Sequence, residues 1–142
     1  MKFLITATLL AFSLSPSSAM AQEKDGDYSA LMAALGMKQL NGEELEQAIA
    51  EAEAFPLGSD RNPVRVDGPS GERHYLSRLR CEDGQAPTFD RTGNVGTGVF
   101  GNIVDLYSVR CTGGLEATDV FMDMYHRKYK ENRPIPGFVL AP

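Results

Sequence analysis

The stretch GNVGTGVFGNIVDLYSVRC, residues 93–111, decides the fold class because its two halves carry opposing signals. The first half spaces three glycines as Gly96-x-Gly98-x-x-Gly101, which is the spacing of a dinucleotide-binding loop. Such a loop must open a helix, whose N-terminus then binds the pyrophosphate. The second half, residues 103–111, is instead rich in β-branched and aromatic residues, which favour a strand. In such a strand one face is shared by Ile103, Asp105, Tyr107, Val109 and Cys111. The sequence therefore argues against a nucleotide site and indicates a β-rich fold.

The glycines of this stretch have a geometric interpretation instead. Gly93, Gly96, Gly98 and Gly101 permit positive φ angles at several places, which suits a wide turn or a bulge between two strands. Loops that a rigid scaffold holds often carry function. The sequence therefore makes these four glycines a candidate binding loop.

Polar–apolar alternation and turn residues predict further short strands around this one. The candidate strands span residues 62–66, 74–81, 88–92, 118–125 and 134–139, the last at a sheet edge because of its two prolines. The segment 74–81 also fits a helix, because Leu76 and Leu79 stand three residues apart. A turn is predicted at residues 67–71, whose sequence is DGPSG. Short strands joined mostly by tight turns indicate an antiparallel sheet.

Residues 22–55 differ from the rest of the chain in charge and in periodicity. They hold eight acidic residues against two lysines, whereas residues 56–142 hold equal numbers of acidic and basic residues. An apolar stripe at three- and four-residue steps predicts a helix with Asn41 as its N-cap, ended by Pro56. A shorter helix is expected over residues 28–35. The expected class is therefore α+β, with an acidic helical segment over 22–55 and a β-rich domain over 56–142.

The first 21 residues have the layout of a secretory signal peptide. Lys2 precedes an apolar run over residues 3–14, and the small residues Ala19 and Ala21 suit cleavage before Gln22. The run is too short for a transmembrane helix, which needs about 20 residues. We therefore expect a periplasmic or secreted bacterial protein that keeps no membrane anchor after cleavage of residues 1–21.

Cys81 and Cys111 are the two cysteines of the chain. In an exported protein an even count indicates a disulfide, and two cysteines allow one intramolecular pairing. A redox-active pair or a pair of metal ligands is the alternative, but the C-x-x-C spacing of redox pairs is absent. We expect a structural disulfide that links two strands or their ends.

The sequence assigns no catalytic residue, no metal ligand and no cofactor. Asp123-x-x-His126 would supply two metal ligands on a helix, but on a strand the two side chains point to opposite faces. A zinc site needs three or four ligands, and His74 or Asp105 would have to complete it by proximity in space. We therefore note Asp105, Asp123 and His126 only as a candidate polar cluster.

The charge of the chain limits its partners. The formal net charge is −5, with no block of basic residues, which argues against nucleic-acid binding. Arg78 and Arg80 would share a strand face and form an anion-binding surface, or they would pair with acidic residues across the sheet. Internal pairing is favoured, because acids and arginines are equally numerous in this part of the chain.

Residues 57–138 resemble a family of small exported bacterial proteins that has no assigned function. The pieces that carry this resemblance are Asn62-Pro63-Val64-Arg65, Tyr75-Leu76-x-Arg78-Leu79-Arg80-Cys81, the glycine stretch with Asp105-x-Tyr107, Cys111, and Asp123-Met124-Tyr125-His126. The resemblance implies export and a small fold, and it implies no activity.

Taken together, these features favour a non-enzymatic exported protein that binds another protein or a cell-envelope component. An inhibitor or immunity protein is one such class, with the glycine loop or the acidic helix as its contact surface. The alternative is a small periplasmic hydrolase or metal-dependent enzyme that uses His126 and Asp123. A structural subunit of an envelope complex is a third possibility.

Overall fold

The computed structural model describes residues 33–34, 38–114 and 116–142. The predicted signal peptide, and all but two residues of the helix expected over 28–35, lie outside the described residues. Within the described part, no helix combines the length and the apolar character needed to cross a bilayer.

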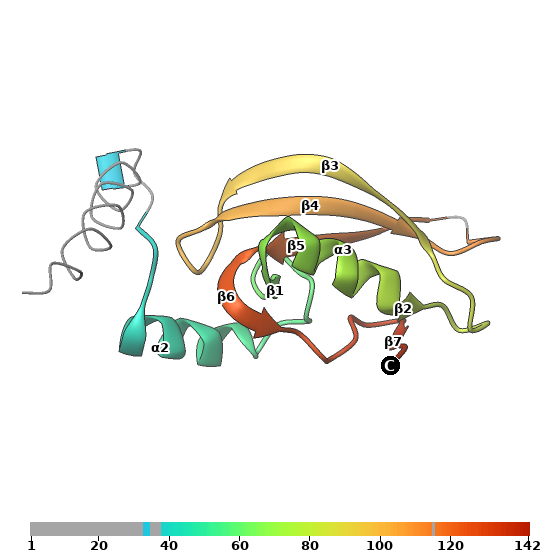
Figure 1. The fold of residues 1–142 in the computed structure, drawn as a ribbon, viewed down its shortest axis with the longest axis horizontal. Coiled ribbons are helices and arrows are strands. Elements are labelled where there is room, and N and C mark those ends of the chain that lie inside the picture. The colour runs from blue at the N-terminus through green and yellow to red at the C-terminus, as the bar shows by residue number, and fades with distance from the viewer. Residues whose placement is uncertain (1–32, 35–37, 115) are drawn as a thin grey trace, which may run out of the picture.

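The chain folds as a mixed α+β structure built on a five-stranded sheet (Figure 1). The elements are α2 (Gly42–Ala52), β1 (Val64–Asp67), α3 (Gly68–Arg78), β2 (Leu79–Arg80), β3 (Thr88–Thr97), β4 (Ile103–Arg110), β5 (Thr118–Asp123), β6 (Tyr125–Lys130) and β7 (Val139–Leu140). The strand order in the large sheet is β3-β4-β5-β1-β6, and β2 and β7 form a separate antiparallel pair. The predicted antiparallel sheet is confirmed apart from one pair, since β1 runs parallel to β5.

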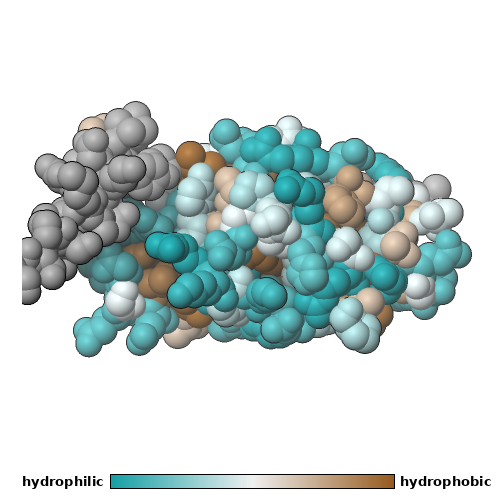
Figure 2. Space-filling model, in the orientation of Figure 1, coloured by the Kyte–Doolittle hydropathy of each residue, from teal (hydrophilic) through white to brown (hydrophobic). Residues whose placement is uncertain are grey.

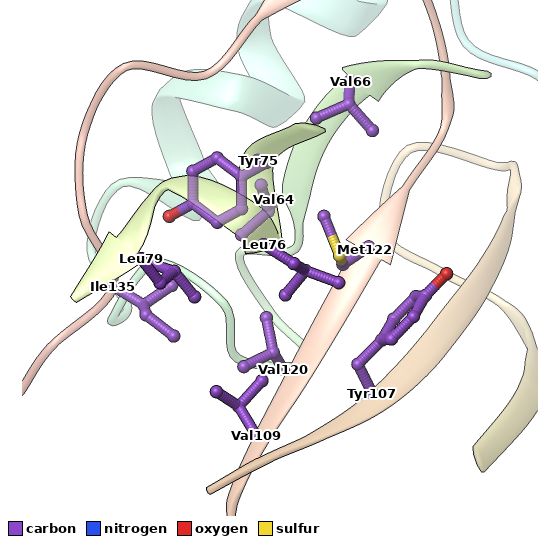
Figure 3. Packing of buried hydrophobic residues seen from close by; sticks show 10 residues of the cluster. All are labelled: Val64, Val66, Tyr75, Leu76, Leu79, Tyr107, Val109, Val120, Met122 and Ile135. Atoms are coloured by element: carbon purple, nitrogen blue, oxygen red, sulfur yellow. The ribbon is translucent and has the colours of Figure 1, made fainter. Parts of the chain in front are cut away.

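The main core lies between α3 and one face of the sheet. Figure 3 shows ten buried apolar side chains that pack together here. They are Val64, Val66, Tyr75, Leu76, Leu79, Tyr107, Val109, Val120, Met122 and Ile135. Full burial of one such side chain contributes about 1.5–3 kcal/mol. The alternation predicted for residues 103–111 is confirmed, because Asp105, Tyr107 and Val109 are all buried on this face.

The disulfide prediction is confirmed. Cys81 and Cys111 are bonded, with their Cα atoms 6.0 Å apart. Cys81 directly follows β2 and Cys111 directly follows β4, so the bond joins the ends of two strands from different sheets. In the chain-entropy picture, closing a loop with a sequence separation of 30 stabilises the fold by about 3–4 kcal/mol.

The strand expected over residues 74–81 is wrong, since most of it belongs to helix α3. Pro69 occupies the first turn of α3, where its missing N–H costs nothing, so the predicted turn at 67–71 is the start of a helix. Glu72, Tyr75 and Leu76 are the buried residues of this helix, at three- and four-residue spacing. Burial of these three side chains against the sheet favours the helix over the strand that the polar–apolar alternation predicted. Within residues 74–81, only β2 is a strand.

The single strand expected over residues 118–125 is two strands. β5 ends at Asp123, the chain turns at Met124, and β6 returns along the other side of β1. The turn is held by Gly68, whose N–H donates to the carbonyl oxygen of Met124 over 2.8 Å. The edge strand expected over 134–139 is also wrong, because only Val139 of that range is in a strand.

The glycine stretch is partly strand and partly turn. The strand expected over 88–92 continues to Thr97, with register shifts between Arg91 and Gly93 and between Asn94 and Thr97. Such shifts are β-bulges, in which an extra residue bends and twists the strand. The wide turn between strands is therefore confined to residues 98–102.

Helix α2 is confirmed, and it contacts the rest of the fold. Asn41 stands at its N-cap, although its side chain makes no capping hydrogen bond. The N–H of Leu40 donates to the carbonyl oxygen of Phe100, and the side chain of Asn62 donates to that of Phe55. The acidic segment therefore lies against the domain at both ends of α2.

Candidate functional site

The structure does not bring the candidate polar cluster together. Asp105 pairs with Met122 in the register of β4 and β5, so Asp105 and Asp123 point to opposite faces of the sheet. On the core face, both oxygens of Asp105 accept hydrogen bonds from Arg91, each over 2.7 Å. This bidentate pair satisfies the buried carboxylate.

Asp123 and His126 meet on the other face, as a buried pair. His126 Nε2 lies 3.2 Å from Asp123 Oδ2, but without the angle of a hydrogen bond. Asp123 is fully buried and accepts hydrogen bonds from the side chain of Asn102 and from the N–H of Tyr125. The His126 ring packs edge-on against Phe100, with ring centroids 5.3 Å apart. These contacts anchor the turn of residues 98–102 to β5 and β6.

The two histidines of the metal-site alternative lie in different surroundings. His74 is exposed on α3 and lines a cavity beside β6, whereas the His126 side chain is only 8% exposed beside Asp123. Among the described residues, no group of three or more His, Cys, Asp or Glu side chains is placed to hold a metal ion.

An ionic network that the sequence reasoning missed ties α2 to the domain. Arg133 donates to Glu53 over 2.6 Å and to Glu131 over 2.9 and 3.0 Å. Burial alone would raise the pKa of Glu131, but the hydrogen bonds from Arg133 outweigh it and lower that pKa. Arg65 lies 3.9 Å from Glu53 and stacks over the ring of Tyr129. Arg133 and Glu53 are 80 positions apart, and Arg65 and Tyr129 are 64 apart, so no local pattern indicates that these residues meet.

A second buried carboxyl, Glu72, was also missed. It is 1% exposed on α3, and Tyr107 Oη donates to its Oε2 over 3.0 Å, whereas Oε1 has no hydrogen-bond partner. Burial raises the pKa of Glu72 to about 7; the Tyr107 hydrogen bond opposes this rise, and nearby Asp105 adds to it. The helical spacing of Glu72 with Tyr75 and Leu76 was the signal that places it on the buried side.

The four glycines of the candidate binding loop have two separate roles. At Gly98 a Cβ atom would collide with Val104, and at Gly101 with the backbone of Lys38, so these two positions allow close packing. Gly93 and Gly96 have open space around them and φ angles of +152° and +90°. They therefore serve the bulged backbone of β3.

A groove opens beside this glycine stretch, and we call it the hairpin groove. Its volume is about 560 Å³, and its lining residues are Asp60, Arg61, Val95, Gly96, Thr97, Gly98, Val99, Val104 and Phe121. Val95 is 50% exposed and Val99 is 42% exposed. In Figure 2, hydrophobic atoms reach the surface at this end of the molecule, close to α2 and to the turn that Figure 1 shows between β3 and β4.

Arg61 forms part of the wall of the hairpin groove. Its guanidinium group lies 3.6 Å from the centre of the Phe55 ring, a cation–π contact that orients the side chain. Arg61 and Val99 also line a smaller hollow of about 120 Å³ against α2. The groove therefore continues from the sheet to the helix.

Comparisons of the chain with protein-family models, with curated proteins and with solved structures found no match. The resemblance to a family of exported bacterial proteins stays a prediction, and function has to be inferred from the geometry of these sites.

Proposed function

We propose that this chain is a non-enzymatic exported protein that binds another protein or a cell-envelope component through the hairpin groove. The observation that carries the proposal is the pair of exposed valines, Val95 and Val99, on the wall of one groove. Export is supported by the disulfide, since such bonds persist in oxidising compartments.

The apolar surface supports a binding role. Among the described residues, the exposed large hydrophobic side chains are Val95, Val99 and Val139, and the first two line the same groove. Val104 and Phe121 line it too. Single exposed apolar residues are ordinary, but apolar residues gathered in one groove are typical of interaction sites.

Arg61 adds a polar anchor to this apolar surface. Arginine is enriched at protein interfaces, where its planar group both stacks and donates several hydrogen bonds. Stacking on Phe55 orders the guanidinium group before binding, so less side-chain entropy is lost when a partner binds. Within the described residues, Arg61 has no ion-pair partner.

Binding through the free edge of β3 is the rival geometry. β3 is ten residues long and lies at the edge of the sheet, where an added strand would pair. Its two bulges interrupt the regular spacing of N–H and C=O groups that pairing needs. The groove is therefore the better contact surface.

The test is affinity purification of the oxidised protein from the envelope fraction of its native host, with three variants compared. The variant V95S/V99S should recover at least about tenfold less of a stoichiometric partner, because the lost apolar contacts weaken binding. The control V139S removes a valine that is even more exposed, at 59%, outside the groove, and it should bind as the wild type does.

If V95S/V99S recovered as much of the partner as the wild type does, the groove would not be the contact surface. If neither the wild type nor any variant recovered a partner, the proposed binding function would be wrong. Substitutions at Gly98 and Gly101 are unsuitable here, because a Cβ atom at either position collides with the protein's own atoms.

A further inference from the structure

We propose that a second cavity, between α3 and β6, binds a small organic anion that carries an apolar body. Its volume is about 420 Å³, within the range of small-molecule sites. The lining residues are Val66, Asp67, Ser70, Gly71, His74, Tyr75, Tyr129, Lys130 and Glu131. We call it the α3–β6 cavity. It shares no lining residue with the hairpin groove, so it is a separate site.

The apolar part of the cavity is rigid. Tyr75 is 1% exposed, and its hydroxyl group donates to the carbonyl oxygen of Arg133 over 2.9 Å, which fixes the ring. Gly71 lets α3 approach β1 closely, since a Cβ atom there would lie 3.1 Å from Cβ of Val66. Val66 itself is buried in the core. These residues form the rigid floor of the cavity, and the half-buried Tyr129 beside them offers aromatic surface to the apolar body of a ligand.

Three polar side chains in the cavity have free donor capacity. Ser70 and His74 stand one turn apart on α3 and therefore share a face of the helix, and Lys130 comes from β6. Across the described residues, none of these three side chains makes a hydrogen bond or an ion pair. The cavity therefore brings together a hydroxyl, an imidazole and an ammonium group that are all available to a ligand.

The acidic side chains of the cavity, by contrast, each already accept at least one hydrogen bond from the protein. Asp67 Oδ2 accepts a hydrogen bond from the N–H of Lys128 over 2.8 Å. Glu131 accepts hydrogen bonds from the N–H groups of Asn132 and Arg133 and from the guanidinium group of Arg133. The free hydrogen-bonding capacity therefore lies mainly with donors, and donors around an apolar surface select an anion.

The position of the cavity favours an anion as well. Ser70 and Gly71 belong to the first turn of α3, where the N–H groups and the helix dipole favour negative charge. This effect is secondary to the side-chain donors. A carboxylate and a phosphate ester both present anionic oxygens that accept hydrogen bonds from these donors. The experiment below therefore compares the two ligand classes.

The experiment is an NMR titration of the oxidised protein with benzoate, phenyl phosphate and the neutral benzamide. Benzoate or phenyl phosphate should shift the amide signals of Ser70, Gly71, His74 and Lys130 in a saturable way. Benzamide should bind at least about tenfold more weakly, because a hydrogen bond to a charged group contributes about 1.5–3 kcal/mol. The tighter of the two anions identifies the ligand class, and either order supports the site.

Variants separate a specific site from general attraction of anions. K130Q should weaken binding of the anion about tenfold. K128Q removes the same charge from the same strand, at a residue that does not line the cavity, and should bind as the wild type does. Both lysines are exposed, and a melting curve of each variant checks that the fold is intact.

Three results would overturn the inference: no saturable shift with either anion, equal affinity for benzamide, or equal weakening by K130Q and K128Q. The variant V95S/V99S should bind the anion unchanged, so this test does not depend on the function proposed for the hairpin groove.

Discussion

The α3 side of the sheet and the hairpin end of the molecule contain similar apolar residues, but these residues are buried in the first region and exposed in the second. On the α3 side, valines 64, 66, 109 and 120 are at most 2% exposed and pack against a helix. At the hairpin end, Val95 and Val99 are 50% and 42% exposed, although Val99 also lines a small hollow against α2. The first region stabilises the fold, and the second leaves apolar surface for a partner.

The comparison is tested most strongly by truncating one side chain in each region. Leu76→Ala should lower the free energy of unfolding by about 4 kcal/mol, because Leu76 is fully buried and the core cannot collapse around the cavity. Val99→Ala should change it by less than about 0.5 kcal/mol, as is usual at exposed sites. Urea unfolding of both variants measures the difference. A large loss for Val99→Ala would mean that the hairpin end is part of the stabilising core.

The disulfide provides the next largest effect. Replacing Cys81 and Cys111 by serine should lower the free energy of unfolding by about 3 kcal/mol, since the unfolded chain regains the entropy of an open loop. Chemical denaturation of the double variant against the oxidised wild type gives the value. If the stability were unchanged, the close approach of the ends of β2 and β4 would be due to packing alone.

Glu72 makes the stability of the α3 side depend on pH. Its pKa rises from 4.5 in the unfolded chain to about 7 in the fold, so the folded state holds an extra proton between these values. The stability linked to this proton is fully present below pH 4.5 and is lost as pH rises to about 7 and beyond. The loss should approach about 3 kcal/mol at pH 8.

Glu72→Gln should abolish this dependence, because glutamine resembles the protonated carboxyl group and does not titrate. The measurement is the free energy of unfolding of wild type and variant between pH 5 and about 8, with Glu46→Gln, at an exposed position of α2, as the control. If the free energy of unfolding varied with pH in the same way for wild type and Glu72→Gln, then Glu72 would ionise in the folded state without loss of stability.

The two regions also differ in how far the sequence predicted them. Residues 103–111 were predicted as a strand with Asp105, Tyr107 and Val109 on one face, and all three are buried there. The alternation along a strand is a local property, so it is visible in neighbouring residues. The exposure of Val95 and Val99 was not predicted, because it depends on which distant segments fail to cover them.

The candidate site shows the same limit. The glycines at 96 and 98 were correctly placed in a bulged, turning segment, but Arg61 and Phe121 beside them were not foreseen. Asp123 and His126 were noted together and do meet, yet Asp105 lies on the opposite face. The sequence predicts which residues of one strand share a face, but it does not predict which residues of other strands they contact.

The sequence by itself determined the α+β class, the Cys81–Cys111 pairing and the helix that ends near Pro56. Each of these follows from local periodicity, from turn chemistry or from the presence of just two cysteines. Only the tertiary structure decided that residues 68–78 form a helix, because the helical conformation buries one side of that segment against the sheet. It also decided that β6 pairs with β1 and that Ser70, His74 and Lys130 gather in one cavity. These arrangements join residues far apart in the chain, and their energy comes from burial and pairing that no single segment contains.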